Sequence, residues 1–262
     1  MYTLATLDHL RAHLGLLASE TSDDPRLLRM LQAASAQIER MAGRRFSPRR
    51  AALQHDYSDA RQLLLSDDLL EPLHILNGDG SSIVLTDVIA VPDEAPYSLL
   101  RLTGGSAFTW TLVPVQAITV TGIWGWHDRP AEMWRGSGDS VQDNPLSSST
   151  TSLTVLDADG ADALGQSPRF QVGHLLKIED EYLRVLAVNA ATNSLTVQRA
   201  VNGTAPAAHA LGTPIYTYQP PGDINALALR WAAWLYKQAD AIQSAPDDLL
   251  FALTALRRLR AA

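Results

Sequence analysis

The sequence contains no cysteine. This absence excludes disulfide bridges, thiol nucleophiles and every zinc site that uses cysteine ligands. It also fits a reducing compartment, so we expect the chain to fold in a cytoplasm. Any bound metal would need histidine, aspartate or glutamate as ligands, and we expect neither a metal nor a cofactor.

Long apolar runs are also missing. No stretch approaches the roughly 18 consecutive apolar residues that a membrane span requires. The segment from Met1 to Leu17 interrupts its apolar residues with charged and histidine side chains and lacks the basic start of a secretory signal. We therefore expect no membrane association. With 262 residues, of which 46% are hydrophobic, the chain is long enough to bury a core in one large or two modest domains.

Positive charge is scarce in the middle of the chain. The whole sequence has 21 basic and 28 acidic residues, but residues 58–147 alone hold 4 basic and 12 acidic residues. Binding to a nucleic-acid backbone depends on lysine and arginine side chains that release condensed counterions. A broad DNA-binding surface is therefore disfavoured, although local arginine clusters remain possible contact points.

The N-terminal region predicts two amphipathic helices. Leucines recur at three- and four-residue steps between Thr3 and Leu17, which places them on one helix face. A second helix is predicted from an N-cap at Ser22 to Gly43. Because each helix carries one apolar stripe, we expect the two to pack as an antiparallel pair.

The pattern changes to short strands after Pro48. A turn at residues 77–80 and another at residues 104–105 separate two of the apolar stretches. We expect a β-meander of about five to seven strands. The predicted strands are 53–57, 62–65, 73–76, 82–91, 97–102, 108–112 and 115–123.

Residues 136–150 are rich in serine, glycine and aspartate and predict a linker. A second β block follows, with strands expected at 153–156, 175–178, 182–188, 195–199 and 214–218. After Pro220 and Pro221, an apolar stripe that includes Trp231 and Trp234 predicts a helix, and a last helix is expected from Pro246 into the C-terminal arginines.

These elements predict an α+β fold. We expect the N-terminal helix pair and the C-terminal helices to pack as a bundle, joined to a β-meander and an inserted all-β domain. The predicted domains are residues 1–147 for the helix pair and meander, 148–218 for the inserted domain, and 219–262 for the helices that complete the main core.

No motif indicates catalysis. The serine-elbow candidate at residues 165–169 lacks its second glycine, and the glycine-rich turn at 78–83 lacks the third glycine of a dinucleotide fingerprint. His9 and His13 have a spacing that a metal could use, but no glutamate follows His9, so we favour surface or interface histidines. We expect a non-enzymatic protein.

Several carboxylate groups also lack a catalytic pattern. The aspartates at 157, 159 and 162 miss the bidentate glutamate of a calcium loop, so an acidic turn is the favoured interpretation. Asp67 with Asp68, and the residues from Glu179 to Glu181, stand in turn-like contexts. We expect both groups to be solvated.

Candidate partner-binding residues are arginines and tryptophans. One arginine cluster follows the second helix, where cations offset the helix dipole or could meet an acidic partner, and another lies at the C-terminus. The tryptophans near residue 125 would share one strand face and serve as core residues or as anchors for a neighbouring subunit. The candidates are Arg40, Arg44, Arg45, Arg49, Arg50, Arg257, Arg258 and Arg260 for partners, and Trp124, Trp126, Trp231 and Trp234 as core or inter-subunit anchors.

A combination of segments resembles the head-tail connector, or adaptor, proteins of long-tailed bacteriophages. These segments are Leu7–Leu16 (LDHLRAHLGL), Asp23–Leu28, Ala33–Arg45 (AASAQIERMAGRR) with Phe46, Gly122–Trp126 (GIWGW) and the helix Asp223–Tyr236. The similarity covers about residues 3–135 and 219–260. The block from about Leu146 to Tyr218 is absent from simpler members. Its segments 173–178, 181–185 and Gln198–Thr204 (QRAVNGT), followed by His209, are similar to a small β module of assorted phage virion proteins.

The resemblance implies a non-enzymatic structural virion protein. Such proteins form a ring, usually of twelve copies, under the portal, line the DNA exit channel and present a platform to the next neck or tail-completion protein. DNA would pass through the lumen without specific binding, and an acidic surface would keep non-specific affinity low. The chain would be made in the host cytoplasm and reside at the head-tail interface of the virion.

Two other classes stay open. A different virion neck or tail protein, or one that binds a host surface, could use the inserted β domain, and exposed aromatic side chains gathered on one face would indicate this. An enzyme of another type would need a deep pocket with convergent titratable groups. For the connector, the C-terminal arginines are the first candidate for portal docking, and the cluster from Arg44 to Arg50 is the second.

Overall fold

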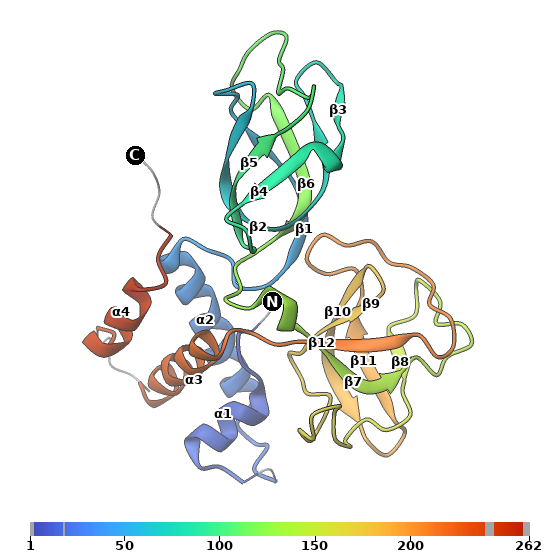
Figure 1. The fold of residues 1–262 in the computed structure, drawn as a ribbon. Coiled ribbons are helices and arrows are strands. Elements are labelled where there is room, and N and C mark those ends of the chain that lie inside the picture. The colour runs from blue at the N-terminus through green and yellow to red at the C-terminus, as the bar shows by residue number, and fades with distance from the viewer. Residues whose placement is uncertain (1–2, 18, 239–243, 259–262) are drawn as a thin grey trace. The chain divides into compact units, whose positions relative to one another are not determined.

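A computed structural model describes residues 3–17, 19–238 and 244–258. The predicted α+β class is confirmed, because the described residues form four α-helices and two antiparallel sheets (Figure 1). The chain divides into two compact units, Met1–Gly43 with Ala131–Ala262, and Arg44–Pro130. This division differs from the predicted boundaries, because the first sheet separates from the helix pair and the second sheet stays with the helices.

The first unit contains all four helices. The N-terminal helix begins after Thr6, whose hydroxyl accepts a hydrogen bond from the backbone N–H of His9. The second helix begins after Asp23, one residue beyond the predicted Ser22, and ends at the predicted Gly43. The helices are α1 (Leu7–Leu14), α2 (Asp24–Ala42), α3 (Gly222–Lys237) and α4 (Asp247–Thr254).

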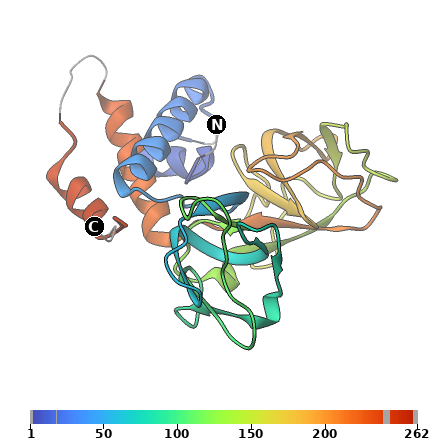
Figure 2. The ribbon, with the colours of Figure 1, turned by 90° about the horizontal axis from the view of Figure 1, so that it is seen from above.

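The helices from the two ends of the chain pack against each other. Helix α3 contacts α1 and α2, and α4 contacts α2 and α3 (Figure 2). The indole Nε1 of Trp231 donates to Gln37 Oε1 at 2.7 Å, and Asn225 Nδ2 donates to the carbonyl of Leu4 at 3.1 Å. The apolar stripes that predicted these helices therefore pack against one another, although α1 and α2 stand near the start of the sequence and α3 and α4 near its end.

The second unit is a six-stranded antiparallel sheet in the order β1-β6-β2-β5-β4, with β3 paired to β2. The predicted number of strands is confirmed, but the meander is wrong: β6 lies between β1 and β2, and β2 pairs with β5, so only the β2–β3 and β4–β5 pairs join strands that follow each other in the sequence. The predicted strand at 108–112 is a loop, and the two predicted strands at 62–65 and 73–76 are one. The strands are β1 (Arg49–His55), β2 (Gln62–Leu76), β3 (Ser82–Ile83), β4 (Val88–Val91), β5 (Tyr97–Leu102) and β6 (Ile118–Trp124).

The second sheet belongs to the first unit, and we call residues 134–218 the β-module. Its strand order is β7-β12-β9-β10-β11-β8, so β7 is an edge strand that pairs with β12. All five strands predicted here are confirmed. The strands are β7 (Trp134–Ser140), β8 (Ser152–Thr154), β9 (Leu175–Ile178), β10 (Glu181–Asn189), β11 (Ser194–Gln198) and β12 (Pro214–Tyr218).

Strand β7 corrects the predicted linker at 136–150 and places the start of the β-module before residue 148. Its sequence, WRGSGDS, lacks the apolar alternation of a half-buried strand. Polar side chains occupy its inward positions instead: Ser137 is fully buried and donates to the carbonyl of Ile215 at 2.7 Å. A strand whose buried positions are polar looks like a linker in the sequence.

The β-module has apolar residues on both faces of its sheet. A large buried cluster includes Phe170, Leu176, Leu183 and Ile215, and a smaller one is formed by Leu175, Tyr182, Val201 and Tyr218 with Trp134 against it. Each buried side chain of this size contributes about 1.5–3 kcal/mol relative to exposure to water. The larger cluster is complete within the β-module itself.

We therefore predict that residues 131–219 fold when they are expressed alone, because their own strands supply the larger core. Amide and methyl NMR spectra should show dispersed resonances and a cooperative thermal transition. A fragment that starts at residue 148 is the matched control: it lacks β7 and should be less stable. A disordered spectrum for residues 131–219 would show that the helices are required.

Candidate functional site

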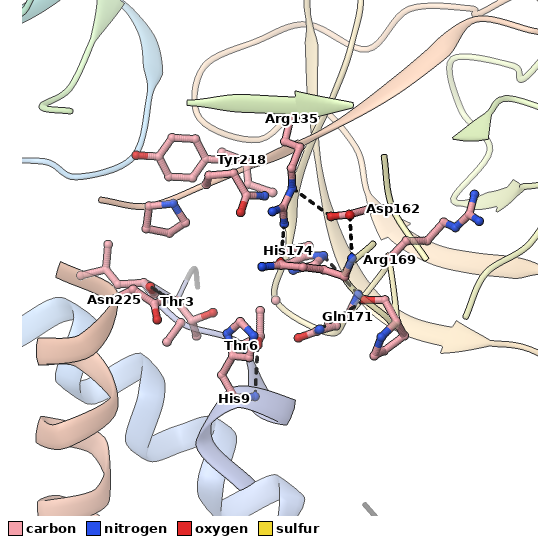
Figure 3. Close-up of a pocket in the computed structure, with 18 residues that line it drawn as sticks. Thr3, Thr6, His9, Arg135, Asp162, Arg169, Gln171, His174, Tyr218 and Asn225 are labelled. Carbon is pink, nitrogen blue, oxygen red and sulfur yellow. Dashed lines mark hydrogen bonds and ion pairs between the residues drawn. The ribbon is translucent and has the colours of Figure 1, made fainter. Parts of the chain in front are cut away.

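A small pocket opens between the segment Thr3–His9 and the β-module, both within the first unit (Figure 3). Its volume is about 50 Å³, enough for a few water-sized groups. The lining comes from the segment before α1 and its first turn, from β7, from the loop between β8 and β9, and from the start of α3. Segments far apart in the sequence thus converge on one site.

The tight contact between these segments depends on Gly173. Its φ of +97° lies in a region that L side chains rarely adopt, and an added Cβ would stand 2.7 Å from Thr3 Oγ1. The backbone there bonds within the β-module, from Gly173 N–H to the carbonyl of Val185 at 2.9 Å. Glycine at this position lets the N-terminal segment approach the module closely.

Arg135 supplies the pocket's strongest positive charge. Its Nε lies 2.9 Å from Asp162 Oδ2, and its Nη2 donates to Gln166 Oε1 at 2.7 Å. Asp162 is almost fully buried and also accepts from the N–H groups of Leu164 and Gln166, both at 2.9 Å. The acidic turn expected here is therefore a buried partner of Arg135.

His174 lines the same pocket and is neutral at pH 7. Burial, together with the nearby positive groups of His9 and Arg135, lowers its pKa to about 4, and the charge of Asp162 opposes this only in part. Its Nδ1 accepts from the N–H of Gln171 at 3.2 Å. In the neutral ring the proton consequently sits on Nε2, which is a hydrogen-bond donor.

Gln171 is the pocket residue with a buried acceptor that lacks a partner, whereas the Nε groups of Arg135 and Arg169 are buried donors without a hydrogen bond. The residue is 8% exposed, and its Nε2 donates to the carbonyl of Pro168 at 3.3 Å. Its Oε1 is buried and accepts no hydrogen bond. An unsatisfied buried acceptor costs about 1–3 kcal/mol, so this oxygen marks a place where a donor would be stabilising.

A second polar cluster lies inside the β-module, around Glu181. Arg199 holds both carboxylate oxygens of Glu181 at 2.7 Å, and the side chain of Glu181 is fully buried. His209, also fully buried, places Nε2 at 2.9 Å from Glu181 and Nδ1 at 2.8 Å from Glu179. The ring of His209 thus bridges the two glutamate side chains.

Several hydrogen bonds keep Glu181 ionised. Burial alone raises its pKa, but bonds from Arg199, the N–H of Ala207, His209 and the N–H of Ala200 outweigh this effect and hold the pKa below its usual value. Arg199 also donates to the carbonyls of Ser147, Thr150 and Ala207 at 2.6–2.9 Å. The cluster thereby joins the loops of the β-module and has no free group for chemistry.

The motif from Gln198 to Thr204, followed by His209, is built into this cluster. Thr204 Oγ1 accepts from the N–H of Tyr182 at 3.0 Å and donates to the carbonyl of Val201 at 2.9 Å. His209 exchanges backbone hydrogen bonds with Leu146 at 2.9 and 3.0 Å. The polar side chains of Arg199, Thr204 and His209 in this segment thus bond within the β-module.

Two predictions of solvated carboxylates are wrong. Glu181 is buried as described, and Asp68 is only 6% exposed and lies 3.6 Å from Arg44. Asp67 accepts from Arg49 at 2.8 Å. No local spacing indicates these pairs, because each joins residues 18 or more positions apart on different strands or loops. Arg169 was also missed; it lies 3.3 Å from Asp139 and Asp157, which stand 30 and 12 positions before it.

The first arginine cluster is consequently divided. Arg44 and Arg49 bind acidic groups of their own unit, and Arg44 also lies over the Trp126 ring, 5.4 Å from its centroid. Arg40, Arg45 and Arg50 are exposed. Within this first cluster, these three arginines have accessible side chains.

Arg257 and Arg258 lie beyond helix α4, not within it as expected. The helix ends at Thr254, Arg257 is exposed, and the N–H of Arg258 donates to the carbonyl of Ala42 at 3.0 Å. The last turn of α4 carries no basic side chain, so Arg257 and Arg258 are not part of it. The third predicted arginine, Arg260, lies outside the described residues.

The four tryptophans have different surroundings. Trp124 is fully buried in the first sheet and donates from Nε1 to the carbonyl of Ala51 at 2.9 Å. Trp231 is buried among the helices, and Trp234 packs edge-on against it while remaining partly exposed. Trp126 is also partly exposed and packs on Phe46, because β6 ends at Trp124 and Gly125 at φ +148° breaks the strand alternation.

Neither a metal cluster nor a membrane-spanning helix occurs among residues 3–17, 19–238 and 244–258. No group of three or more histidine or acidic side chains there could hold a metal ion, so the spacing of His9 and His13 is not completed into a site. No helix in this part is long and apolar enough to cross a bilayer.

Glu181 gives a first testable prediction. Glu181→Gln should lower the free energy of unfolding by about 3 kcal/mol, because it leaves the buried Arg199 charge without its counter-ion. Glu179→Gln is the matched control, since that side chain is 60% exposed, and should cost at most about 1 kcal/mol. Urea unfolding measures both, and equal losses would contradict the assignment of the buried charge.

His174 gives a second prediction, on acid stability. Because its folded pKa of about 4 lies below the usual 6.5, the unfolded chain takes up the proton first as pH falls. The free energy of unfolding should therefore drop by about 2–4 kcal/mol between pH 6.5 and 4 through this residue. His174→Asn, which keeps an acceptor for Gln171, should flatten this part of the profile; exposed His13→Asn is the control. An unchanged slope in His174→Asn would refute the cause given.

No model of a known protein family and no curated protein matches this sequence. The resemblance to phage connector proteins therefore rests on the sequence segments quoted above, and the function that it implies is a proposal.

Proposed function

We propose that the chain is a structural, non-enzymatic protein of a long-tailed phage virion, which forms a ring under the portal and joins the DNA-filled head to the neck or tail. The observation that supports this most is the position of the resembling segments. The buried residues among them, such as Leu10, Ile38, Phe46 and Trp231, build the cores of their units. The resemblance therefore concerns residues that build the fold.

The β-module supports the same interpretation. Its resembling residues Arg199, Thr204 and His209 bond within the module, and the pocket near His174 is small. Catalysis usually requires titratable groups that converge on a substrate-sized cavity. A structural role explains why the polar side chains of this motif bond to groups within the β-module.

The charge of the second unit agrees with a DNA conduit. Asp67 and Asp68 are paired with arginines, but several other acidic residues of this unit are exposed: Asp56, Asp59, Glu71, Asp79, Asp93 and Glu94. Surfaces with the charge sign of DNA keep non-specific affinity low. In the proposed ring, DNA passes through the lumen without specific binding.

An exposed apolar loop offers a surface for assembly. Leu112, Val113 and Val115 are 61–89% exposed. The loop is held at its base, where Tyr57 N–H donates to the carbonyl of Pro114 at 2.7 Å. Exposed apolar groups on a fixed loop are typical of protein contact sites. The proposed partners are other copies of the chain, usually twelve per ring, the portal protein and the next neck or tail-completion protein.

The alternative, a host-surface-binding protein that uses the β-module, has less support. It calls for aromatic side chains gathered on an exposed face. Phe170, Tyr182 and Tyr218 are at most 6% exposed, and Tyr216 is 40% exposed. One accessible ring among these four does not make a binding face, so the connector role is preferred.

The test uses the portal protein encoded by the same genome. Mass photometry and negative-stain electron microscopy should show rings of this chain bound to portals, and the complex should weaken as salt increases, since repeated arginine contacts are screened. The triple variant Arg257→Ser, Arg258→Ser, Arg260→Ser should keep its thermal midpoint and lose portal binding. Arg29→Ser, on the exposed side of α2, is the control.

Two outcomes would count against these proposals. If the unaltered chain forms no complex with portals at any salt concentration, the connector function is wrong. If the triple variant binds portals normally, docking through the C-terminal arginines is wrong, and the exposed Arg45 and Arg50 become the next residues to change.

A further inference from the structure

We propose that the pocket between Thr3–His9 and the β-module binds the carboxyl end of a peptide chain. The α-carboxylate would lie on Arg135 and His174, and the N–H of the last residue would donate to Gln171 Oε1. This inference does not depend on the connector function, because it uses only the groups that line the pocket.

The unpartnered oxygen of Gln171 indicates what the ligand must donate. The residue is 92% buried, its amide nitrogen is already used on Pro168, and its Oε1 accepts nothing. Figure 3 shows this side chain reaching toward the side of the pocket formed by Thr6 and His9. A ligand that offers an N–H at this point would remove the cost of an unsatisfied acceptor.

Arg135 and His174 offer the donors for a carboxylate. The Nη2 group of Arg135 donates to Gln166 and its Nε forms an ion pair with Asp162, whereas no hydrogen bond involves its Nη1. His174 accepts at Nδ1 from Gln171 and consequently presents its Nε2–H as a donor. Two donors from different strands and loops can hold both oxygens of one carboxylate.

The local charge also favours a carboxylate. Helix α1 begins at the pocket, with Thr6 as its N-cap, so the positive end of the helix dipole faces the site. His9 and Arg135 both act on His174 as positive groups, and Asp162 is the carboxylate that opposes them. The site therefore attracts a single negative charge. A bound carboxylate would accept hydrogen bonds from Arg135 and His174.

The combination selects a peptide end over other anions. Acetate has no donor for Gln171, and a phosphate ion offers O–H groups on a tetrahedral centre but no N–H beside a planar carboxylate. The last residue of a peptide carries an N–H and a carboxylate on the same α-carbon. These two groups are close enough together to contact neighbouring side chains of the pocket at the same time. With a volume of about 50 Å³, the pocket has room for a small last residue such as glycine or alanine.

The experiment uses the full chain and N-acetylglycine, which is the smallest mimic of a peptide end. Calorimetry should show saturable binding in the millimolar range, and the imidazole resonances of His174 should shift in NMR spectra. N-acetylglycinamide, which lacks the carboxylate, should bind at least tenfold more weakly. Acetate, inorganic phosphate and N-acetylleucine should each bind more weakly than N-acetylglycine.

Variants separate the two halves of the site. Gln171→Leu should remove the advantage of N-acetylglycine over acetate, and Arg135→Lys should weaken both; His13→Ala, on α1 but outside the pocket, should change neither. The comparison of ligands on the unaltered chain needs no variant to fold. Equal binding of N-acetylglycine and its amide, or tighter binding of phosphate, would overturn the proposal. So would a folded Gln171→Leu protein that keeps the full preference.

Discussion

The two ends of this chain depend on each other to bury their apolar helix faces. Leu27, Leu31 and Ile38 on α2 are fully buried, and Trp231 on α3 is 2% exposed. Each such side chain contributes about 1.5–3 kcal/mol on burial, a gain that a lone helix in water would lose. The first sheet and the β-module both lie, in sequence, between α2 and α3, so the chain passes through both sheets before this helical core is completed.

Buried charge pairs organise the loops around the apolar core of the β-module. Arg199 joins Glu181 to the carbonyls of two loops, Arg169 joins Asp139 to Asp157, and Arg135 joins Asp162 to Gln166. A guanidinium group can make five directed hydrogen bonds, so one arginine can fix several loops at once. Because a buried charge without its partner is costly, these pairs also specify which loops come together.

The sequence predicted what depends on local periodicity and missed what depends on contacts between distant residues. The leucine spacing of α1 and α2 and the stripe around Trp231 predicted helices that are present, and five strands of the β-module followed from short apolar runs. Strand β7 was missed because Ser137 and Asp139 occupy its buried positions. The strand order of the first sheet was missed because β6 inserts between β1 and β2, which no local pattern records.

The candidate site was hidden for the same physical reason. Thr3, Arg135 and His174 stand on segments that are separated by more than thirty residues each, and none belongs to a recognisable spacing. The residues that did form a recognisable motif, such as Arg199 and His209, satisfy one another inside the β-module. A motif whose polar side chains bond to one another maintains a shape. The Oε1 of Gln171, a buried acceptor without a partner, lies outside the motif. In the proposed peptide site, recognition would therefore depend on residues that the fold brings together and that no motif in the sequence marks.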